Sequence, residues 1–332
     1  GLDDVLCGGL RRNRAYLIEG VPGSGKTTLA LQFLRCAASR GEPVLYVTLS
    51  ETIEELRTAA ESHGWSLDGI TLREIMPSED ALDLGESSTM FHLSEVELAS
   101  TTQQVLADVE SLQPTCVVID SLSELRLLSG SALPYRREIL ALEQDFNKRG
   151  CTVVLLDDLT AIDQDSHIQS IAHCVILLEQ MNPEYGADRR RLRVRKYRGV
   201  SFRSGYHDYA IRADGLEVYP RLVASEHRAV GARLKLKSGI PEIDSLLGGG
   251  VEQGTSTLII GAAGTGKSTL AVQFAAAAAA RGQKSAVYVF DESPVTLTTR
   301  ASELGINLSS AIDRGLVGIR QVDPAELSPG EL

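Results

Sequence analysis

Residues 20–27 read Gly20-Val21-Pro22-Gly23-Ser24-Gly25-Lys26-Thr27, and this glycine-rich stretch decides the fold. It fits G-x-x-x-x-G-K-[ST], in which backbone N–H groups face nucleotide phosphates, the lysine adds positive charge and the hydroxyl holds Mg²⁺. The same pattern returns as Gly261-Ala262-Ala263-Gly264-Thr265-Gly266-Lys267-Ser268, where Lys267 follows Lys26 by 241 positions. The sequence therefore predicts a P-loop protein with two phosphate-binding loops.

Each loop stands between an apolar segment and a helical one, which is the setting that this motif requires. Apolar residues precede the loops at 15–19 and 257–260, and helices are expected at 28–38 and 269–280. ATP and Mg²⁺ are the expected ligands. Nucleotide contacts are assigned to Gly23, Ser24, Gly25, Lys26, Thr27 and Thr28, and to Gly264, Thr265, Gly266, Lys267, Ser268 and Thr269.

The segments after the first loop predict an α/β fold. Apolar runs at 15–18, 44–48, 115–119, 152–156 and 174–178 alternate with helical segments. Continuous apolar runs suit strands that are buried on both faces of a mostly parallel sheet between helices. Shorter alternating runs at 191–195, 206–211 and 215–219 favour an antiparallel extension.

Internal repetition predicts two domains. Residues 1–67 align without a gap on residues 242–308, which pairs Asp3 with Asp244 and Gly64 with Gly305. We expect a first domain at 1–220, a linker at 221–237 and an incomplete second copy at 238–332. The 241-residue offset places the later parts of that copy, including its Walker B aspartate near position 361, beyond Leu332.

Composition restricts the classes of function. The chain has 332 residues, with 33 lysines and arginines against 44 acidic residues and a net charge of −11, which disfavours a generic nucleic-acid-coating surface. Five cysteines without C-x-x-C spacing are interpreted as reduced thiols. No apolar run approaches the length of a membrane span, so we expect a cytoplasmic protein without a membrane partner.

Acids at strand ends are the candidates for hydrolysis. Asp120 ends the run at 115–119 and is predicted to orient Mg²⁺ with Thr27; the alternative is a helix N-cap. Ser268 is the metal-binding hydroxyl of the second copy. Glu51 and Glu292 follow a strand expected to neighbour the P-loop strand and are candidate general bases; the alternative is a helix start.

The basic run at 189–198 has three open interpretations. Alternation at 191–195 places arginines on one strand face and apolar residues on the other. The run could be a charged edge strand, a nucleic-acid face or a group inserted into a neighbouring subunit's nucleotide site.

Several motifs together resemble the KaiC family of RecA-like ATPases over nearly the whole chain. They are Asp3 to Leu10 before the first loop, the strand-end acids, Asp120-Ser121 and Lys196-Tyr197-Arg198-Gly199. The resemblance implies tandem RecA-like domains, a homohexameric ring with ATP between subunits, and signalling or clock-type partners.

The resemblance also implies residue roles. The family's adjacent catalytic glutamates correspond to Ser50-Glu51 and Asp291-Glu292, so the first copy lacks one acid and slow hydrolysis is expected. Lys196 and Arg198 match residues that reach a neighbour's γ-phosphate. Ser170 matches a family phosphoacceptor, with an ordinary polar turn as the alternative, and its second-copy counterpart falls near position 411.

The function expected from the sequence is ATP hydrolysis at the subunit interfaces of a ring, with serine/threonine autokinase activity implied by the resemblance. One alternative is a RecA- or RadA-type DNA-dependent recombination ATPase, which the net charge disfavours. The other is a non-hydrolysing ATP-switch scaffold, which is suggested by Ser50 at the position of one of the two acids.

Overall fold

The computed structural model describes residues 1–75, 90–129, 132–159, 166–223 and 234–332. Contacts within the chain divide it into two units. The first is Gly1–Arg221 with Ser328–Glu331, and the second is Leu222–Leu327 with Leu332. Most of the expected linker at 221–237 lies outside the described residues.

The first unit is built on one nine-stranded sheet with the strand order β3-β2-β4-β5-β1-β6-β7-β8-β9. Its strands are β1 (Ala15–Gly20), β2 (Val44–Thr48), β3 (Ile70–Glu74), β4 (Cys116–Asp120), β5 (Thr152–Asp158), β6 (Cys174–Met181), β7 (Arg189–Tyr197), β8 (His207–Arg212) and β9 (Gly215–Tyr219). The strands from β3 to β6 in that order are parallel, and β7, β8 and β9 are antiparallel. The mostly parallel α/β fold expected from the sequence is confirmed.

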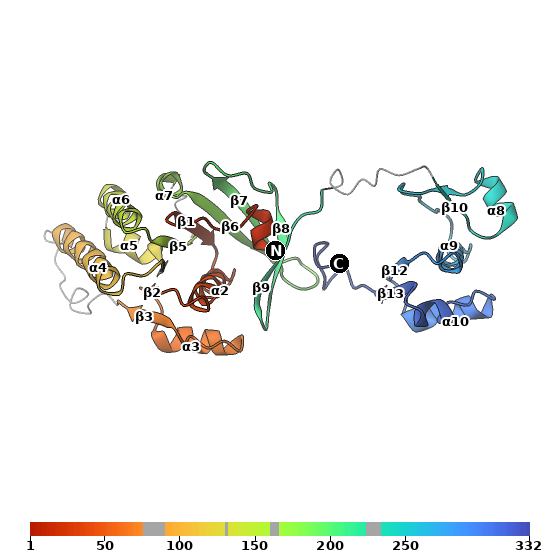
Figure 1. Cartoon of the computed structure of the whole chain (residues 1–332), viewed down its shortest axis with the longest axis horizontal. Coiled ribbons are helices and arrows are strands. Elements are labelled where there is room, and N and C mark those ends of the chain that lie inside the picture. Colours follow the sequence, from red (N-terminus) through yellow and green to blue (C-terminus); the bar gives the residue numbers. More distant parts are fainter. Residues whose placement is uncertain (76–89, 130–131, 160–165, 224–233) are drawn as a thin grey trace. The chain divides into compact units, whose positions relative to one another are not determined.

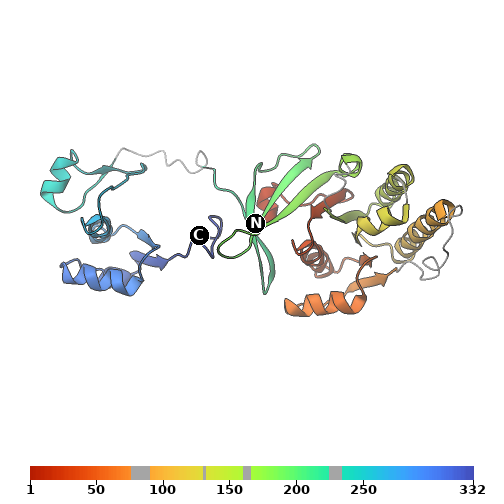
Figure 2. The same cartoon turned by 180° about the vertical axis from the view of Figure 1, so that it is seen from behind.

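Helices cover both faces of this sheet (Figures 1 and 2). They are α1 (Leu2–Val5), α2 (Lys26–Ala38), α3 (Ile53–Ser62), α4 (Met90–Leu112), α5 (Leu122–Ser129), α6 (Ala132–Lys148) and α7 (Ser166–Ile171). Alternate residues of β1 enter different cores. Tyr16 and Ile18 pack with α2 and α3, whereas Leu17 packs with α4, α5 and α6. This two-sided burial explains why the central strands are apolar throughout.

Strand β3 was not expected from the sequence. It reads Ile-Thr-Leu-Arg-Glu, and only Ile70 in it is buried. It pairs with β2 alone, at the edge of the sheet. An edge strand needs little apolar surface, so its composition gives a weak signal.

The second unit has its own small apolar core, which includes Val272, Leu297 and Val317. Its elements are β10 (Lys235–Leu236), α8 (Pro241–Leu246), β11 (Val251–Glu252), α9 (Lys267–Ala280), β12 (Ser285–Val289), α10 (Pro294–Glu303), α11 (Ser309–Asp313) and β13 (Val317–Gln321). β10 pairs with β11 antiparallel, and β12 pairs with β13 parallel.

The strand expected at 257–260 is wrong. These residues form no strand, and Leu258 and Ile260 are 81% and 84% exposed. In the first unit, β1 is hydrogen-bonded between β5 and β6. Residues 257–260 have no corresponding strand pairing among the described residues.

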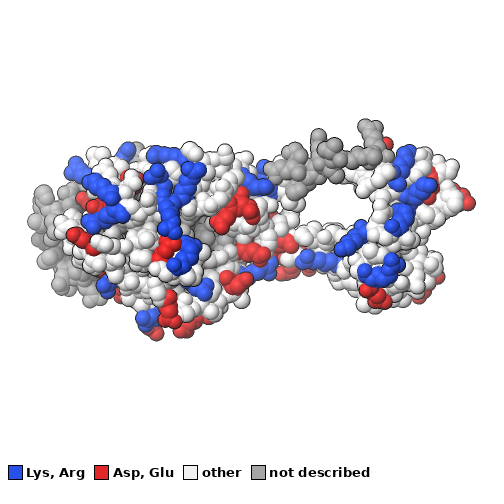
Figure 3. All heavy atoms as spheres, in the orientation of Figure 1, with Lys and Arg blue, Asp and Glu red and all other residues white. Residues whose placement is uncertain are grey.

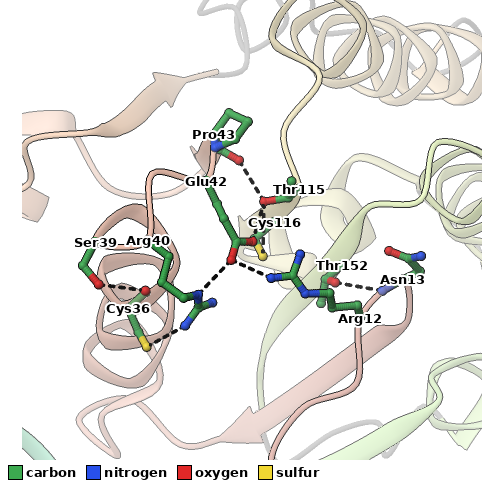
Figure 4. A network of polar contacts seen from close by, with 10 residues as sticks. All are labelled: Arg12, Asn13, Cys36, Ser39, Arg40, Glu42, Pro43, Thr115, Cys116 and Thr152. Atoms are coloured by element: carbon green, nitrogen blue, oxygen red, sulfur yellow. Dashed lines mark hydrogen bonds and ion pairs between the residues drawn. The ribbon is translucent and has the colours of Figure 1, made fainter.

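A polar network joins four segments at the amino-terminal ends of the strands, whereas the first P-loop follows the carboxyl end of β1 (Figure 4). At its centre, Glu42 accepts hydrogen bonds from Arg12 at 2.6 Å, from Arg40 at 2.8 Å and from Thr115 at 3.1 Å. The hydrogen bond from Arg40 is the largest influence lowering the pKa of the Glu42 carboxyl. The network ties the end of α2 to the starts of β1, β2 and β4.

Candidate nucleotide-binding site

The first P-loop connects β1 to α2, and its shape depends on glycine at two positions. A Cβ on Gly20 would lie 2.5 Å from Ser24 Oγ and 2.8 Å from the Leu178 oxygen. Gly25 is the N-cap of α2 at φ 89°, a left-handed conformation that glycine adopts without strain. Tyr209 on β8 supports the loop by donating to the Ser24 carbonyl oxygen at 2.6 Å.

Lys26 lies back over its own loop. Its Nζ donates to the carbonyl oxygens of Gly20 at 3.0 Å and Val21 at 3.2 Å, and it forms an ion pair with Asp158 Oδ1 at 2.7 Å. Asp158 is a site residue that the sequence reasoning missed. It ends β5, directly beside Gly20 in the sheet register.

Thr27 and Asp120, the two candidate metal-binding residues of the first copy, are in contact. Thr27 Oγ1 donates to Asp120 Oδ2 at 3.1 Å, and the hydroxyl of Tyr46 donates to the same oxygen at 2.5 Å. Burial raises the pKa of the Asp120 carboxyl, while these two hydrogen bonds act to lower it. The carboxylate therefore faces α2 and β2, which supply both of these hydrogen-bond donors.

This pair of oxygen ligands fits Mg²⁺. Within the described ranges of the chain, no group of three or more His, Cys, Asp and Glu side chains could hold a metal ion. Mg²⁺ commonly uses one or two protein oxygens together with substrate phosphates, so a hydroxyl and a carboxylate beside a phosphate-binding loop suffice.

Glu51 reaches the same region by a route that differs from the expected one. Its strand, β2, does not neighbour β1, because β4 and β5 lie between them. The prediction that the strand before Glu51 neighbours the P-loop strand is therefore wrong. β2 instead neighbours β4, with Thr48 opposite Asp120, which brings the residues after both strands together.

The surroundings of Glu51 set its chemistry. Thr52 is the N-cap of α3, and Glu55 completes the capping box. These two residues, and not Glu51, therefore cap the start of the helix. Burial raises the pKa of the Glu51 carboxyl. The charges of Asp120, Glu55 and Asp158 raise it further. A half-buried carboxyl with a raised pKa suits a general base.

The second loop repeats the geometry of the first. Lys267 Nζ donates to the carbonyl oxygens of Gly261 at 2.9 Å and Ala262 at 2.8 Å, which correspond to Gly20 and Val21. Gly264 and Gly266 have φ values of 77° and 86°, against 79° and 89° for Gly23 and Gly25. Thr265 and Ser268, like the rest of this loop, lie in a largely exposed segment.

Glu292 is held differently from Glu51. Its Oε1 accepts from Arg300 at 2.8 Å in an ion pair within its own unit. The neighbouring α10 is capped by Ser293, as α3 is capped by Thr52. The charge of Glu292 is therefore partly neutralised in this structure.

A family model described as ATPase: KaiC matches residues 1–223 and 236–327. The chain belongs to the KaiC ATPase family. The circadian clock oscillator protein KaiC of Acaryochloris marina is 27% identical over 331 residues, covering 96% of this chain and 61% of the relative. The circadian clock protein KaiC2 of Synechocystis sp. is 28% identical over 321 residues, covering 96% and 56%. The chain thus spans less than two thirds of the length of these relatives.

Lys196 and Arg198 of this KaiC-family chain lie away from its first P-loop. Lys196 is opposite Val175 near the start of β6, whereas Gly20, where the loop begins, is opposite Leu178, three residues further along that strand. Lys196 Nζ donates to the Gln169 carbonyl oxygen at 2.5 Å, and Arg198 donates to that of Ser170. Ser170 is exposed near the end of α7.

Three other arginines of β7, Arg191, Arg193 and Arg195, pair with acids of the same unit. Leu192 and Val194 are buried on one face, which confirms the alternation expected from the sequence. On the other face, Arg191 pairs with Glu179 at 2.8 Å and its guanidinium lies 3.8 Å from the ring centre of Tyr206. These contacts favour the structural interpretation of the run over a nucleic-acid face.

Two buried acids beside the P-loop were also missed by the sequence reasoning. Glu19 and Asp157 are directly opposite each other on β1 and β5. Gln169 donates to both carboxylate oxygens of Glu19, at 2.8 and 3.0 Å, and Arg126 donates to Asp157 at 2.5 Å. Burial raises the pKa of Asp157 to about 6, although Arg126 acts to lower it.

The raised pKa of Asp157 predicts a pH-dependent stability. Because the folded chain holds this proton more tightly than the unfolded chain, the free energy of unfolding should fall as the pH rises from about 4 to about 6, by roughly 2–3 kcal/mol. Asp157→Asn lacks the titrating group and should lose this component of the slope. Urea unfolding across that range measures the difference between the two chains, and parallel slopes would contradict the assignment.

Within the described residues, none of the helices combines the length and the apolar character that a bilayer crossing needs.

Proposed function

We propose that this KaiC-family chain binds Mg²⁺-ATP at its first P-loop and hydrolyses it. The supporting observation is the meeting of Lys26, Thr27, Asp120 and Glu51 at the carboxyl ends of the central strands. In this proposal Gly23 to Thr28 bind the phosphates, Lys26 contacts the β/γ end, and Thr27 and Asp120 hold the metal. Bound Mg²⁺ would neutralise charge on the phosphate oxygens.

Glu51 is the proposed base. It orients a water molecule and accepts its proton as the water oxygen bonds to the γ-phosphorus and the bond from phosphorus to the departing ADP oxygen breaks. Ser50 is exposed and supplies no second carboxylate. We therefore expect turnover to depend on Glu51 and to be slow.

We further propose a homo-oligomeric ring with ATP between subunits, as the family membership suggests. Lys196 lies opposite Val175, three residues along β6 from the residue opposite Gly20, and both cations are directed at α7, so we assign their role to a neighbour's nucleotide. Both side chains would then leave the carbonyl oxygens at the end of α7. Phosphorylation of the exposed Ser170, beside these cations, belongs to the same proposal.

Tandem organisation is proposed with a first domain at 1–220, a linker at 221–237 and part of a second domain at 238–332. Hydrogen bonds repeated at the 241-residue offset support it. Gly8 donates to the Asp3 carbonyl oxygen at 2.9 Å, and Gly249 donates to that of Asp244 at 2.7 Å. Glu292 and Ser268 would have the roles of Glu51 and Thr27 in the second copy.

A mixing experiment tests the interface. Lys26→Ala and Arg198→Ala chains should each be nearly inactive alone. Mixed subunits should regain ATPase activity, because roughly a quarter of the interfaces then pair an intact loop with an intact Arg198. Light scattering with and without ATP gives the assembly mass. A monomer with full activity, or no recovery on mixing two folded variants, contradicts action between subunits.

The DNA-dependent alternative is tested in the same assay by adding single-stranded DNA. Acidic side chains lie among the basic ones on the face seen in Figure 3, which does not favour a continuous nucleic-acid surface there. Stimulation of turnover by DNA would favour the recombination ATPase. Tight ATP binding with no turnover would favour the switch scaffold.

A further inference from the structure

We infer that Asp158 is a positioning residue that restrains the P-loop lysine and weakens ATP binding at the first site. This inference rests on the proposed binding of ATP at the Lys26 loop, and it names a residue that limits the ATP affinity of that site.

The sheet order places Asp158 where it can act. β5 lies between β1 and β4, and Asp158, its last residue, is directly opposite Gly20 at the start of the loop. One carboxylate oxygen pairs with Lys26 Nζ at 2.7 Å. The other accepts from Ser123 Oγ at 3.3 Å, and Ser123 is itself hydrogen-bonded to Ser121 at 2.7 Å. The carboxylate is therefore held on both sides.

The hydrogen-bonding capacity of Lys26 is fully used in this arrangement. An ammonium has three donors, and Lys26 directs them at Gly20 O, Val21 O and Asp158 Oδ1. A phosphate oxygen must displace one of these acceptors. The carboxylate is the charged acceptor and hence the strongest competitor, because charge-assisted hydrogen bonds are about twice as strong as neutral ones.

The cost extends beyond the lost ion pair. Once Lys26 turns to the phosphates, the Asp158 carboxylate loses its cationic partner, and its charge acts to raise the pKa of both Glu51 and Asp120. Like charges repel, and the incoming phosphates add to the repulsion. Removing the charge of Asp158 should therefore favour the bound state.

The test measures ATP affinity in the 332-residue chain carrying Lys267→Ala, so that the first loop is read alone. Asp158→Asn in this background should lower the Kd for Mg²⁺-ATP about tenfold, or about 1.4 kcal/mol. Asp158→Ser should shift the Kd in the same direction. The KM for hydrolysis should fall with the Kd, whereas a merely structural role would lower the melting temperature without tightening binding.

Glu124→Gln is the matched control. Glu124 lies near enough to Asp158 for that charge to raise its pKa, but it has no contact with Lys26. Its removal should change the Kd less than twofold, which separates pairing with Lys26 from general charge. Equal or weaker ATP binding by the folded Asp158 variants overturns the inference alone. If no chain binds ATP at the Lys26 loop, the proposed function fails and the inference falls with it.

Discussion

Lys26→Ala is expected to reduce ATP binding and turnover at the first site at least about a hundredfold. The substitution removes a nearly buried ammonium from a loop whose other phosphate donors are backbone N–H groups. Loss of one charged contact to a transferring phosphoryl group costs on the order of 3 kcal/mol. Binding of a fluorescent ATP analogue and phosphate release measure the two effects separately.

Lys267→Ala is the matched control for this prediction. It removes the corresponding lysine from a loop with the same glycine conformations, while Thr27, Asp120 and Glu51 stay intact. It should leave most of the hydrolysis in place. If Lys267→Ala abolishes turnover and the folded Lys26→Ala chain keeps it, the assignment of chemistry to the first loop is wrong.

Sequence reasoning succeeded where local pattern determines structure. The apolar runs that form β1, β2, β4, β5 and β6 are buried on both faces. Each strand can therefore be predicted from its own residues, because they are apolar throughout. The P-loops were located in the same way, from glycine spacing. The segment at 257–260 has the same local pattern and forms no strand, so the pattern alone does not determine the structure there.

Sequence reasoning missed what depends on the order of strands. Asp157 and Asp158 are visible as acids that follow an apolar run, but no local feature says that their strand lies between β1 and β4. In the sequence, Tyr46 is not distinguished from the apolar residues of its strand. Its hydrogen bond to Asp120 is visible only in the structure. The strand before Glu51 does not neighbour β1 as predicted, and Glu51 nevertheless lies near Asp120 because β2 pairs with β4.

Glu51→Gln is expected to lower kcat by about 10²- to 10⁴-fold while leaving ATP affinity within a fewfold of the unmodified chain. The amide keeps the shape of the side chain and cannot accept the proton of the attacking water. Among the described residues, the Glu51 carboxylate has no hydrogen bond or ion pair, so the change breaks no structural contact. Single-turnover phosphate release gives the rate, and equilibrium binding gives the affinity.

The pH profile gives an independent measure of the same residue. A base must be ionised to accept a proton, so activity should be lost as the pH falls through the pKa of Glu51. Burial raises that pKa above 4.5, so the acid limb should lie at a higher pH than for an exposed glutamate. Glu54→Gln, an exposed change on the next helix, should leave both the limb and kcat unchanged. Full activity in Glu51→Gln would require a different base, and Asp158 would then be the first carboxylate to substitute.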